Sequence, residues 1–149
     1  MLQRIALAFI LCTLMLAGAP LKAAAEKDKI EGLWYNAEQT AKVQIYRAVE
    51  GKFWGKIVWL KEPVRNGKPR TDDKNPKESI RSRPLMNLPI LLHFVREDDD
   101  TYSKGEIYDP KNGKTYSCTI TYRSDSELGI RGYIGISMIG RTTTWKRAE

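Results

Sequence analysis

Residues 105–118 (GEIYDPKNGKTYSC) bring together groups that could contact a ligand or take part in acid–base chemistry: the carboxylate of Asp109, the amide of Asn112 and two phenols. The same stretch fits a tight turn, in which Asp accepts a local amide hydrogen bond, Pro fixes φ and Gly113 takes a positive φ. Turn chemistry accounts for every residue of the stretch. We therefore expect structural roles for Asp109 and Gly113, at a corner between two strands.

The residue types that nucleophilic or metal-dependent catalysis needs are scarce. His93 is the sole histidine and has apolar neighbours on both sides, so an imidazole base has one candidate. One histidine and Cys118 cannot supply a usual set of zinc ligands, and the acidic run at 97–100 lacks the spaced oxygens and the glycine of a calcium loop. No metal, cofactor or enzymatic activity is predicted, and the enzymatic alternative is a hydrolase centred on His93.

The first 25 residues have the pattern of a signal peptide. Arg4 supplies a positive start, residues 5–18 are apolar, and the three alanines at 23–25 provide the small residues that precede a cleavage site. We expect cleavage near Ala25 and a periplasmic or secreted protein, with residues 26–149 forming a single domain. A membrane-spanning helix needs roughly 20 apolar residues, and nothing after Ala25 approaches that length, so no membrane span is expected.

The elements that must position any site are strands, because period-two alternation dominates the chain after residue 25. In residues 114–122 the side chains of Tyr116, Cys118, Ile120 and Tyr122 share one face, whereas serine and threonine occupy the other. This is typical of a half-buried strand. Eight such segments are predicted: 32–36, 42–47, 53–60, 90–95, 102–109, 114–122, 127–133 and 140–147.

Most connections between these segments are short enough for hairpins, which predicts an antiparallel meander. Eight strands that each have one apolar face are best accommodated in a closed up-and-down barrel, since closure removes the exposed strand edges. A two-sheet β-sandwich is the alternative. An eight-stranded barrel has room for packed side chains or for one small ligand. The side chains expected to face inward are Ile57, Trp59, Tyr116, Tyr122 and Ile130.

The candidate ligand contacts are therefore Tyr116, Tyr122, Trp59 and Arg141. Arg141 shares a strand face with Trp145, and an inward guanidinium is costly unless it is paired. It is expected either to brace the barrel seam against Trp34 or to anchor a ligand carboxylate, and the brace is favoured. Trp34 and Trp145 lie on the first and last strands, which closure makes neighbours.

One connection, residues 61–89, is long, rich in proline and free of strand pattern. Asn75 is the expected N-cap of a short helix that ends before Pro84, in a structured loop over one end of the barrel. The loop holds eight basic and four acidic residues, the candidates for anion contact being Arg65, Lys68, Arg70, Lys74, Arg81 and Arg83. It is either a solvated loop or a surface that draws an anionic partner toward the opening. Nucleic acid is not expected, because stacking aromatics are not interleaved with these cations.

Two resemblances to known families follow from these residues. Gly32 and Trp34 form a G-x-W motif that, with Arg141 and Arg147 late in the chain, resembles the arrangement of lipocalins, in which an arginine lies across the first-strand tryptophan. More specifically, the segments GLWY, GKIVWLKEP, TDDKNP, RSRPL, GEIYDPKNGKTYSC and RGYIGISMIGRTTTW, in this order, resemble the bacterial exported family called domain of unknown function 2147. That resemblance implies a secreted or periplasmic small β-barrel and brings no agreed activity.

The sequence departs from that family at two places. MNLP stands where the family usually has a glycine, and KFWG replaces a frequent cysteine before the glycine, so a disulfide to Cys118 is not expected. The leading functional hypothesis is a non-enzymatic envelope protein that binds a small apolar or amphipathic ligand. The alternative is a filled barrel whose basic loop engages another protein or an anionic polymer of the envelope. The oligomeric state is left open.

Overall fold

The computed structural model describes residues 26–135 and 139–148, so the predicted leader at 1–25 lies outside the described residues. The elements are β1 (Gly32–Tyr35), β2 (Ala41–Arg47), β3 (Phe53–Leu60), β4 (Val64–Arg65), β5 (Lys68–Pro69), η1 (Glu78–Ile80), β6 (Pro89–Arg96), β7 (Thr101–Asp109), β8 (Lys114–Ser124), β9 (Glu127–Tyr133) and β10 (Gly140–Arg147).

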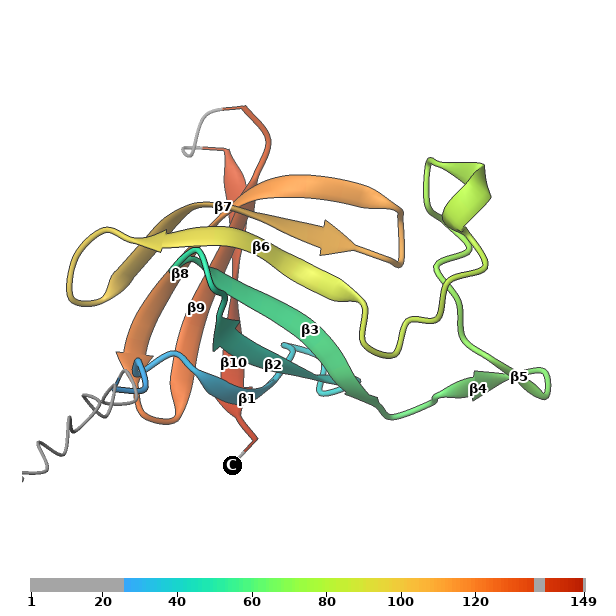
Figure 1. Ribbon diagram of the computed structural model, residues 1–149, viewed down its shortest axis with the longest axis horizontal. Coiled ribbons are helices and arrows are strands. Elements are labelled where there is room, and N and C mark those ends of the chain that lie inside the picture. The colour runs from blue at the N-terminus through green and yellow to red at the C-terminus, as the bar shows by residue number, and fades with distance from the viewer. Residues whose placement is uncertain (1–25, 136–138, 149) are drawn as a thin grey trace, which may run out of the picture.

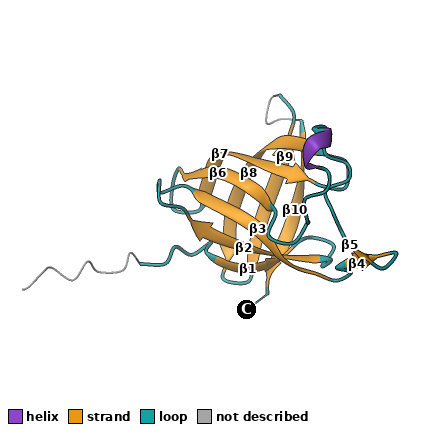
Figure 2. Ribbon diagram, turned by 45° about the vertical axis from the view of Figure 1, so that its right-hand side comes forward, coloured by secondary structure: helices purple, strands orange, loops and turns teal. Residues whose placement is uncertain are grey.

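Eight of these strands close into an antiparallel barrel in the order β1-β10-β9-β8-β7-β6-β3-β2 (Figures 1 and 2). Each corresponds to a segment predicted from the sequence, and the predicted barrel is confirmed. The β-sandwich is excluded because β1 pairs with β10 and leaves no open edge. The two-residue strands β4 and β5, which were not predicted, form a separate hairpin within the long loop.

Alternation along the strands gives the barrel one continuous core. In β8, Cys118 and Ile120 are fully buried while Thr119 between them faces outward, and Tyr116 and Tyr122 lie half-buried at the two ends of the same face. The Cys118 thiol is free, and its burial raises its pKa to about 12. As expected for a buried thiol, its reactivity is suppressed.

The seam between the first and last strands is held by Arg147 rather than by Arg141. Trp34 and Arg147 are register partners, and the guanidinium carbon lies 4.0 Å from the centroid of the indole ring. Gly32 makes room for this arrangement, since an added Cβ would lie 2.7 Å from Arg147 Nη1. Arg147 Nη2 also donates to the carbonyl of Lys29 at 2.8 Å. The expected brace therefore exists, but Arg141, six residues earlier, is at the opposite end of β10.

A bulge in β3 reverses the predicted direction of Trp59. Lys42 pairs with Trp59 whereas the next residue of β2, Val43, pairs with Ile57, so Val58 is an extra residue on the β3 side. One inserted residue moves the following side chains to the other face. Ile57 therefore points inward as predicted, but Trp59 is 37% exposed on the outside, where its ring packs edge-on against Tyr35.

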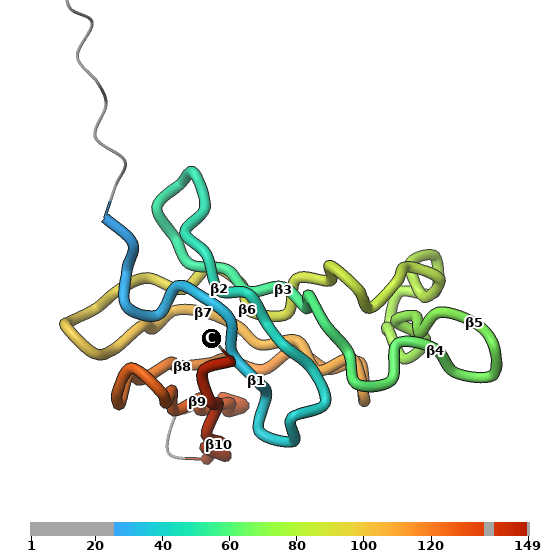
Figure 3. Tube along the Cα trace, turned by 90° about the horizontal axis from the view of Figure 1, so that it is seen from below, coloured from blue at the N-terminus to red at the C-terminus, as the bar shows by residue number. Residues whose placement is uncertain are grey.

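The long loop folds back onto the same end of the barrel as the β7–β8 turn, as the views of Figures 1 and 3 agree. The contact is close: Gly113 has φ +72°, and an added Cβ would lie 1.9 Å from the carbonyl oxygen of Lys74. The predicted helix is only a single 3-10 turn at Glu78–Ile80, with Lys77 rather than Asn75 at its N-cap position. Asn75 instead turns inward, where its side chain joins a buried polar cluster.

Candidate functional site

A cavity of about 560 Å³ opens at the end of the barrel that carries the long loop. Side chains from four strands give it an apolar lining: Ile57 of β3, Ile90 of β6, Ile130 of β9 and Trp145 of β10. Leu85 of the long loop adds an apolar contact above them. Small-molecule sites typically have volumes of about 300–1,000 Å³ and a predominantly apolar lining. The cavity therefore has the size and lining of a ligand site.

The rim of this cavity is polar and charged. Glu38 of the β1–β2 loop forms an ion pair with Lys111 of the β7–β8 turn. The hydrogen bond from Lys111, followed by its charge, holds the pKa of Glu38 below its ordinary value, and Arg141 adds to the effect. Arg70 and Arg141 also line the rim, and the side chain of neither forms a hydrogen bond or ion pair with another residue among 26–135 and 139–148. Within the described part of the chain these two guanidinium groups thus have no ion-pair partner, and they stand above an apolar floor.

The structure places two of the four residues predicted to contact a ligand at the cavity and the other two elsewhere. Tyr116 and Arg141 line the cavity, and their contact with a ligand stays a prediction. Trp59 is outside the barrel, for the reason given above. Tyr122 lies near the opposite end of the barrel, where its hydroxyl donates to Asp125 and Lys29 Nζ is 4.5 Å from its ring centroid.

The turn at residues 109–113 is confirmed in detail. The carbonyl of Asp109 accepts from the amide of Gly113 at 2.8 Å, and its side-chain oxygen accepts from the amide of Lys111 at 2.9 Å. Asn112 Nδ2 donates to the hydroxyl of Tyr116 at 3.0 Å. Asp109 and Asn112 are also rim residues of the cavity, so the structural corner and the candidate site coincide.

A buried carboxylate fixes the long loop to the barrel wall. Asp72 is fully buried and accepts hydrogen bonds from the Tyr108 hydroxyl at 2.5 Å, from Asn75 Nδ2 at 2.8 Å and from Arg83 Nε at 2.9 Å. Burial and the hydrogen bond to Asp72 raise the pKa of Tyr108. Because Tyr108 belongs to β7, this network holds in place the loop that supplies Arg70 to the rim.

Two of the six basic residues named as candidates for anion contact have partners inside the long loop. Arg81 Nε donates to the carbonyl of Asn75 at 2.7 Å, and Arg83 forms an ion pair with Asp72. Both arginines thus have structural roles inside the loop. The remaining four are exposed or half-exposed around a groove beside the cavity: Arg65, Lys68, Arg70 and Lys74.

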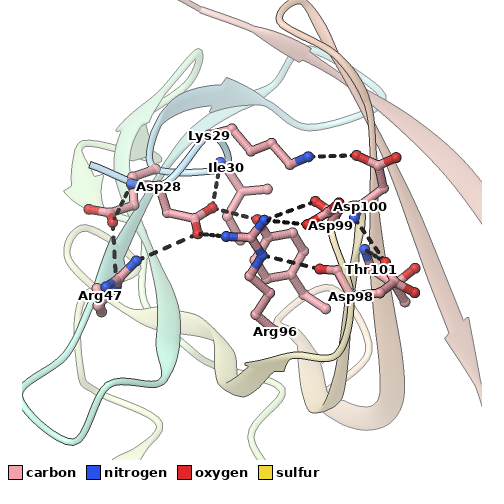
Figure 4. Close-up of polar contacts among 11 residues, drawn as sticks. Asp28, Lys29, Ile30, Arg47, Arg96, Asp98, Asp99, Asp100 and Thr101 are labelled. Carbon is pink, nitrogen blue, oxygen red and sulfur yellow. Dashed lines mark hydrogen bonds and ion pairs between the residues drawn. The ribbon is translucent and has the colours of Figure 1, made fainter. Parts of the chain in front are cut away.

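The opposite end of the barrel is closed by a polar cluster around Asp28, whose side chain is 1% exposed. Figure 4 shows the guanidinium groups of Arg47 and Arg96 approaching this carboxylate from opposite sides, with N···O distances of 3.5 and 3.4 Å. The Tyr102 hydroxyl donates to the other carboxylate oxygen at 2.5 Å. Burial, and next the hydrogen bond to Asp28, raise the pKa of Tyr102. The cluster stabilises the closed end and leaves the cavity at the other end.

The sole histidine lies away from the cavity. His93 is exposed on β6, with φ +62° and its ring centroid 4.3 Å from that of Trp54. Its side chain makes no hydrogen bond to another residue of the described ranges. No group of three potential metal ligands occurs within the described part of the chain, and no helix there is long and apolar enough to cross a membrane.

Sequence reasoning missed two parts of this site for a common reason. Asp72 stands beside Asp73 in a polar loop, and Glu38 and Lys111 are 73 residues apart in the chain. Only the tertiary fold shows that Asp72 is buried or that Glu38 and Lys111 meet. The aspartate–asparagine spacing in TDDKNP was a usable signal, although it pointed to a helix cap.

Known proteins resemble this chain in fold and in family. A solved structure described as protein HP1028 from Helicobacter pylori, belonging to the lipocalin family, matches with a TM-score of 0.71 at 24% sequence identity, covering 82% of this chain and 84% of that one. No curated protein matches the sequence. The model of a family described as uncharacterised protein conserved in bacteria (DUF2147) matches residues 32–147. With that match spanning most of the chain and the lipocalin-like barrel described above, the protein belongs to the DUF2147 family.

Proposed function

We propose that this protein is an exported, non-enzymatic binding protein that holds a small apolar or amphipathic ligand in the open end of its barrel. The single observation that carries the proposal is the cavity of about 560 Å³ with an apolar lining. Burial of apolar ligand surface contributes about 25 cal/mol per Å² before the costs of association. A lining of isoleucines and one tryptophan suits that mode of binding better than it suits polar recognition.

The distribution of side chains along the barrel axis supports the same proposal. Toward the closed end the interior is filled by large, fully buried groups such as Phe94, Tyr102 and Leu128. Toward the open end β9 carries Gly132, which has no side chain to fill the interior. An eight-stranded barrel has interior volume for side chains or for one small ligand. The absence of a side chain at Gly132 contributes to the volume that a ligand would occupy.

Export is proposed from the first 25 residues, whose charged start, apolar stretch and alanines are typical of a cleaved signal peptide. A soluble carrier in the envelope would then have access to lipids and other amphiphiles. Fractionation of the host cells, together with N-terminal sequencing of the purified protein, tests this part. A chain that keeps residues 1–25 and remains in the cytoplasm would contradict it.

Gly132 offers a direct test of the cavity. A Cβ added there would lie 3.7 Å from Ile107 and from Tyr116, which is ordinary van der Waals contact, so a larger side chain can extend into the cavity without a backbone clash. Gly132→Leu should lower the affinity for the neutral probe N-phenyl-1-naphthylamine at least tenfold. Its free energy of unfolding should be unchanged or higher, because a strand glycine is replaced and a void is filled.

The matched control is Thr115→Leu, which adds the same side chain at an exposed position on the outer face of β8. It should bind the probe as the wild type does. Energy transfer from the tryptophans, of which Trp145 lines the cavity, reports binding of the probe. Equal affinities of Gly132→Leu and wild type would refute the proposal. Native mass spectrometry of protein from its own host should also show a bound adduct that Gly132→Leu lacks.

A further inference from the structure

A second hollow, of about 900 Å³, lies on the long loop beside the cavity. It runs between the β4–β5 hairpin, the segment before η1 and the β7–β8 turn. Arg65, Lys68, Arg70 and Lys74 line it, and Asp73 is the acidic residue that faces them. Clefts lined by charges of one sign concentrate the electrostatic field and raise the local concentration of oppositely charged ligands. We call this hollow the basic groove.

The cations of the basic groove differ from four arginines elsewhere in the protein. Arg47, Arg83, Arg96 and Arg147 are each held by a carboxylate or by backbone carbonyls. By contrast, the side chains of the four groove cations form no hydrogen bond, ion pair or ring contact with another residue in the described ranges. Asp72, the fully buried carboxylate of the loop, forms an ion pair with Arg83. The groove cations thus have no ion-pair partner in the described ranges.

The basic groove and the apolar cavity are adjacent. They share four lining residues: Arg70, Leu85, Pro110 and Lys111. Arg70 therefore stands at the junction, with apolar cavity on one side and the other groove cations on the other. A molecule that spans the junction would meet apolar walls at one end and several positive charges at the other.

We propose that the preferred ligand is a single-chain amphiphile with a multiply charged anionic head, such as a phosphate, whose chain occupies the cavity and whose head lies in the basic groove. This inference rests on the proposed function and adds the chemical class of the ligand. Several cations around one groove suit a phosphate head better than a single carboxylate, because each phosphate oxygen can accept a charge-assisted hydrogen bond. The Asp72 network holds the loop backbone against β7, so the groove forms before the ligand arrives and less ordering accompanies binding.

Two lysophospholipids with the same lauroyl chain test the proposal. Lauroyl lysophosphatidic acid has a phosphate head with a net negative charge, whereas lauroyl lysophosphatidylcholine has a zwitterionic head. At low salt and below the critical micelle concentration, displacement of N-phenyl-1-naphthylamine should show the acid binding about tenfold more tightly. That preference should shrink at 0.5 M salt, because exposed charges are screened over a few ångströms there.

Lys68→Gln/Lys74→Gln removes two groove charges without touching the cavity lining. Exposed charge pairs contribute modestly to affinity, so the double variant should weaken lysophosphatidic acid about tenfold and leave lysophosphatidylcholine unchanged. The matched control, Lys27→Gln/Lys52→Gln, removes two exposed lysines that line neither hollow and should change neither affinity. Thermal unfolding should be the same for all three proteins.

The possible results separate this inference from the proposed function. Equal affinities for the two lipids, or equal effects of the two double variants, would overturn the head-group assignment while leaving a cavity ligand in place. Failure of both lipids and of the neutral probe to bind would overturn both. Inorganic phosphate as tight as lysophosphatidic acid would show a site for free anions instead. Heparin that binds through Lys68 and Lys74 without displacing lysophosphatidic acid would assign the groove to a polymer, against the proposal.

Discussion

Asp72→Ala is expected to destabilise the attachment of the long loop by about 2–4 kcal/mol. The carboxylate is fully buried, and its removal leaves the buried Tyr108 hydroxyl without its acceptor, at about 1–3 kcal/mol. Asn75 Nδ2 loses one acceptor but keeps the Tyr108 oxygen at 3.1 Å, so its contribution is smaller. Arg83 is 39% exposed at its side chain and can be hydrated, so it adds little.

Asp73→Ala is the matched control, because Asp73 is the neighbouring residue, is exposed and makes no hydrogen bond to another described residue. It should change the free energy of unfolding by less than about 0.5 kcal/mol. Urea denaturation followed by tryptophan fluorescence measures the global effect, and limited proteolysis across residues 61–88 measures local release of the loop. Release can limit the global loss, since a loop can open while the barrel stays folded.

The reasoning is refuted if Asp72→Ala matches Asp73→Ala in both measurements. A double-mutant cycle with Tyr108→Phe isolates the hydrogen bond between Tyr108 and Asp72. Contacting residues in one network should show a coupling of about 0.5–3 kcal/mol. A coupling near zero would mean that burial alone, and not this hydrogen bond, holds the loop.

Two further predictions concern the seam and the buried thiol. Arg147→Met should lower the free energy of unfolding by about 2–3 kcal/mol, because it removes a cation–π contact with Trp34 and a hydrogen bond. Arg141→Met is the control and should leave the free energy of unfolding unchanged. Similar thermal denaturation of both variants would contradict the assignment of Arg147 to the seam. Burial raises the pKa of Cys118 to about 12, so the folded state favours the neutral thiol. The contribution of this preference to folding stability is complete below the pKa of the thiol in the unfolded chain. It is lost as the pH rises from that value toward the raised pKa of the folded state. Between pH 8 and pH 10 this should reduce stability by about 1–2 kcal/mol, and Cys118→Ala should remove that part of the pH dependence; identical pH profiles would count against it.

The barrel could be predicted because its evidence is local and repeated. Alternation in β8 separates Cys118 and Ile120 from their serine and threonine neighbours, and the same pattern recurs in seven other segments. Trp59 was misplaced because a bulge adds one residue opposite β2, and no local signal in FWGKIVWL marks it. A shift of one residue along a strand is enough to move a side chain from the interior to the surface.

The candidate site was less predictable because it depends on partners distant in the chain. Arg141 and Arg147 lie on the same strand face in the sequence, and only the pairing of Arg147 with Trp34 decides which one braces the seam. Charge counting showed an excess of cations in the long loop. It could not show that Arg81 and Arg83 are used internally, since that depends on the burial of Asp72 and on the path of the loop.

The cluster at the closed end sets the practical limits of the folding unit. The family match begins at residue 32, yet Asp28 lies four residues earlier and neutralises Arg47 and Arg96 from inside the barrel. At the other terminus the amide of Ala148 donates to the carbonyl of Leu33 at 2.8 Å, one residue beyond the matched range. A clone trimmed to the family boundaries would leave two arginines and a tyrosine facing an empty position. An expressed chain should therefore include residues 28–148, with affinity tags and protease sites placed outside this range.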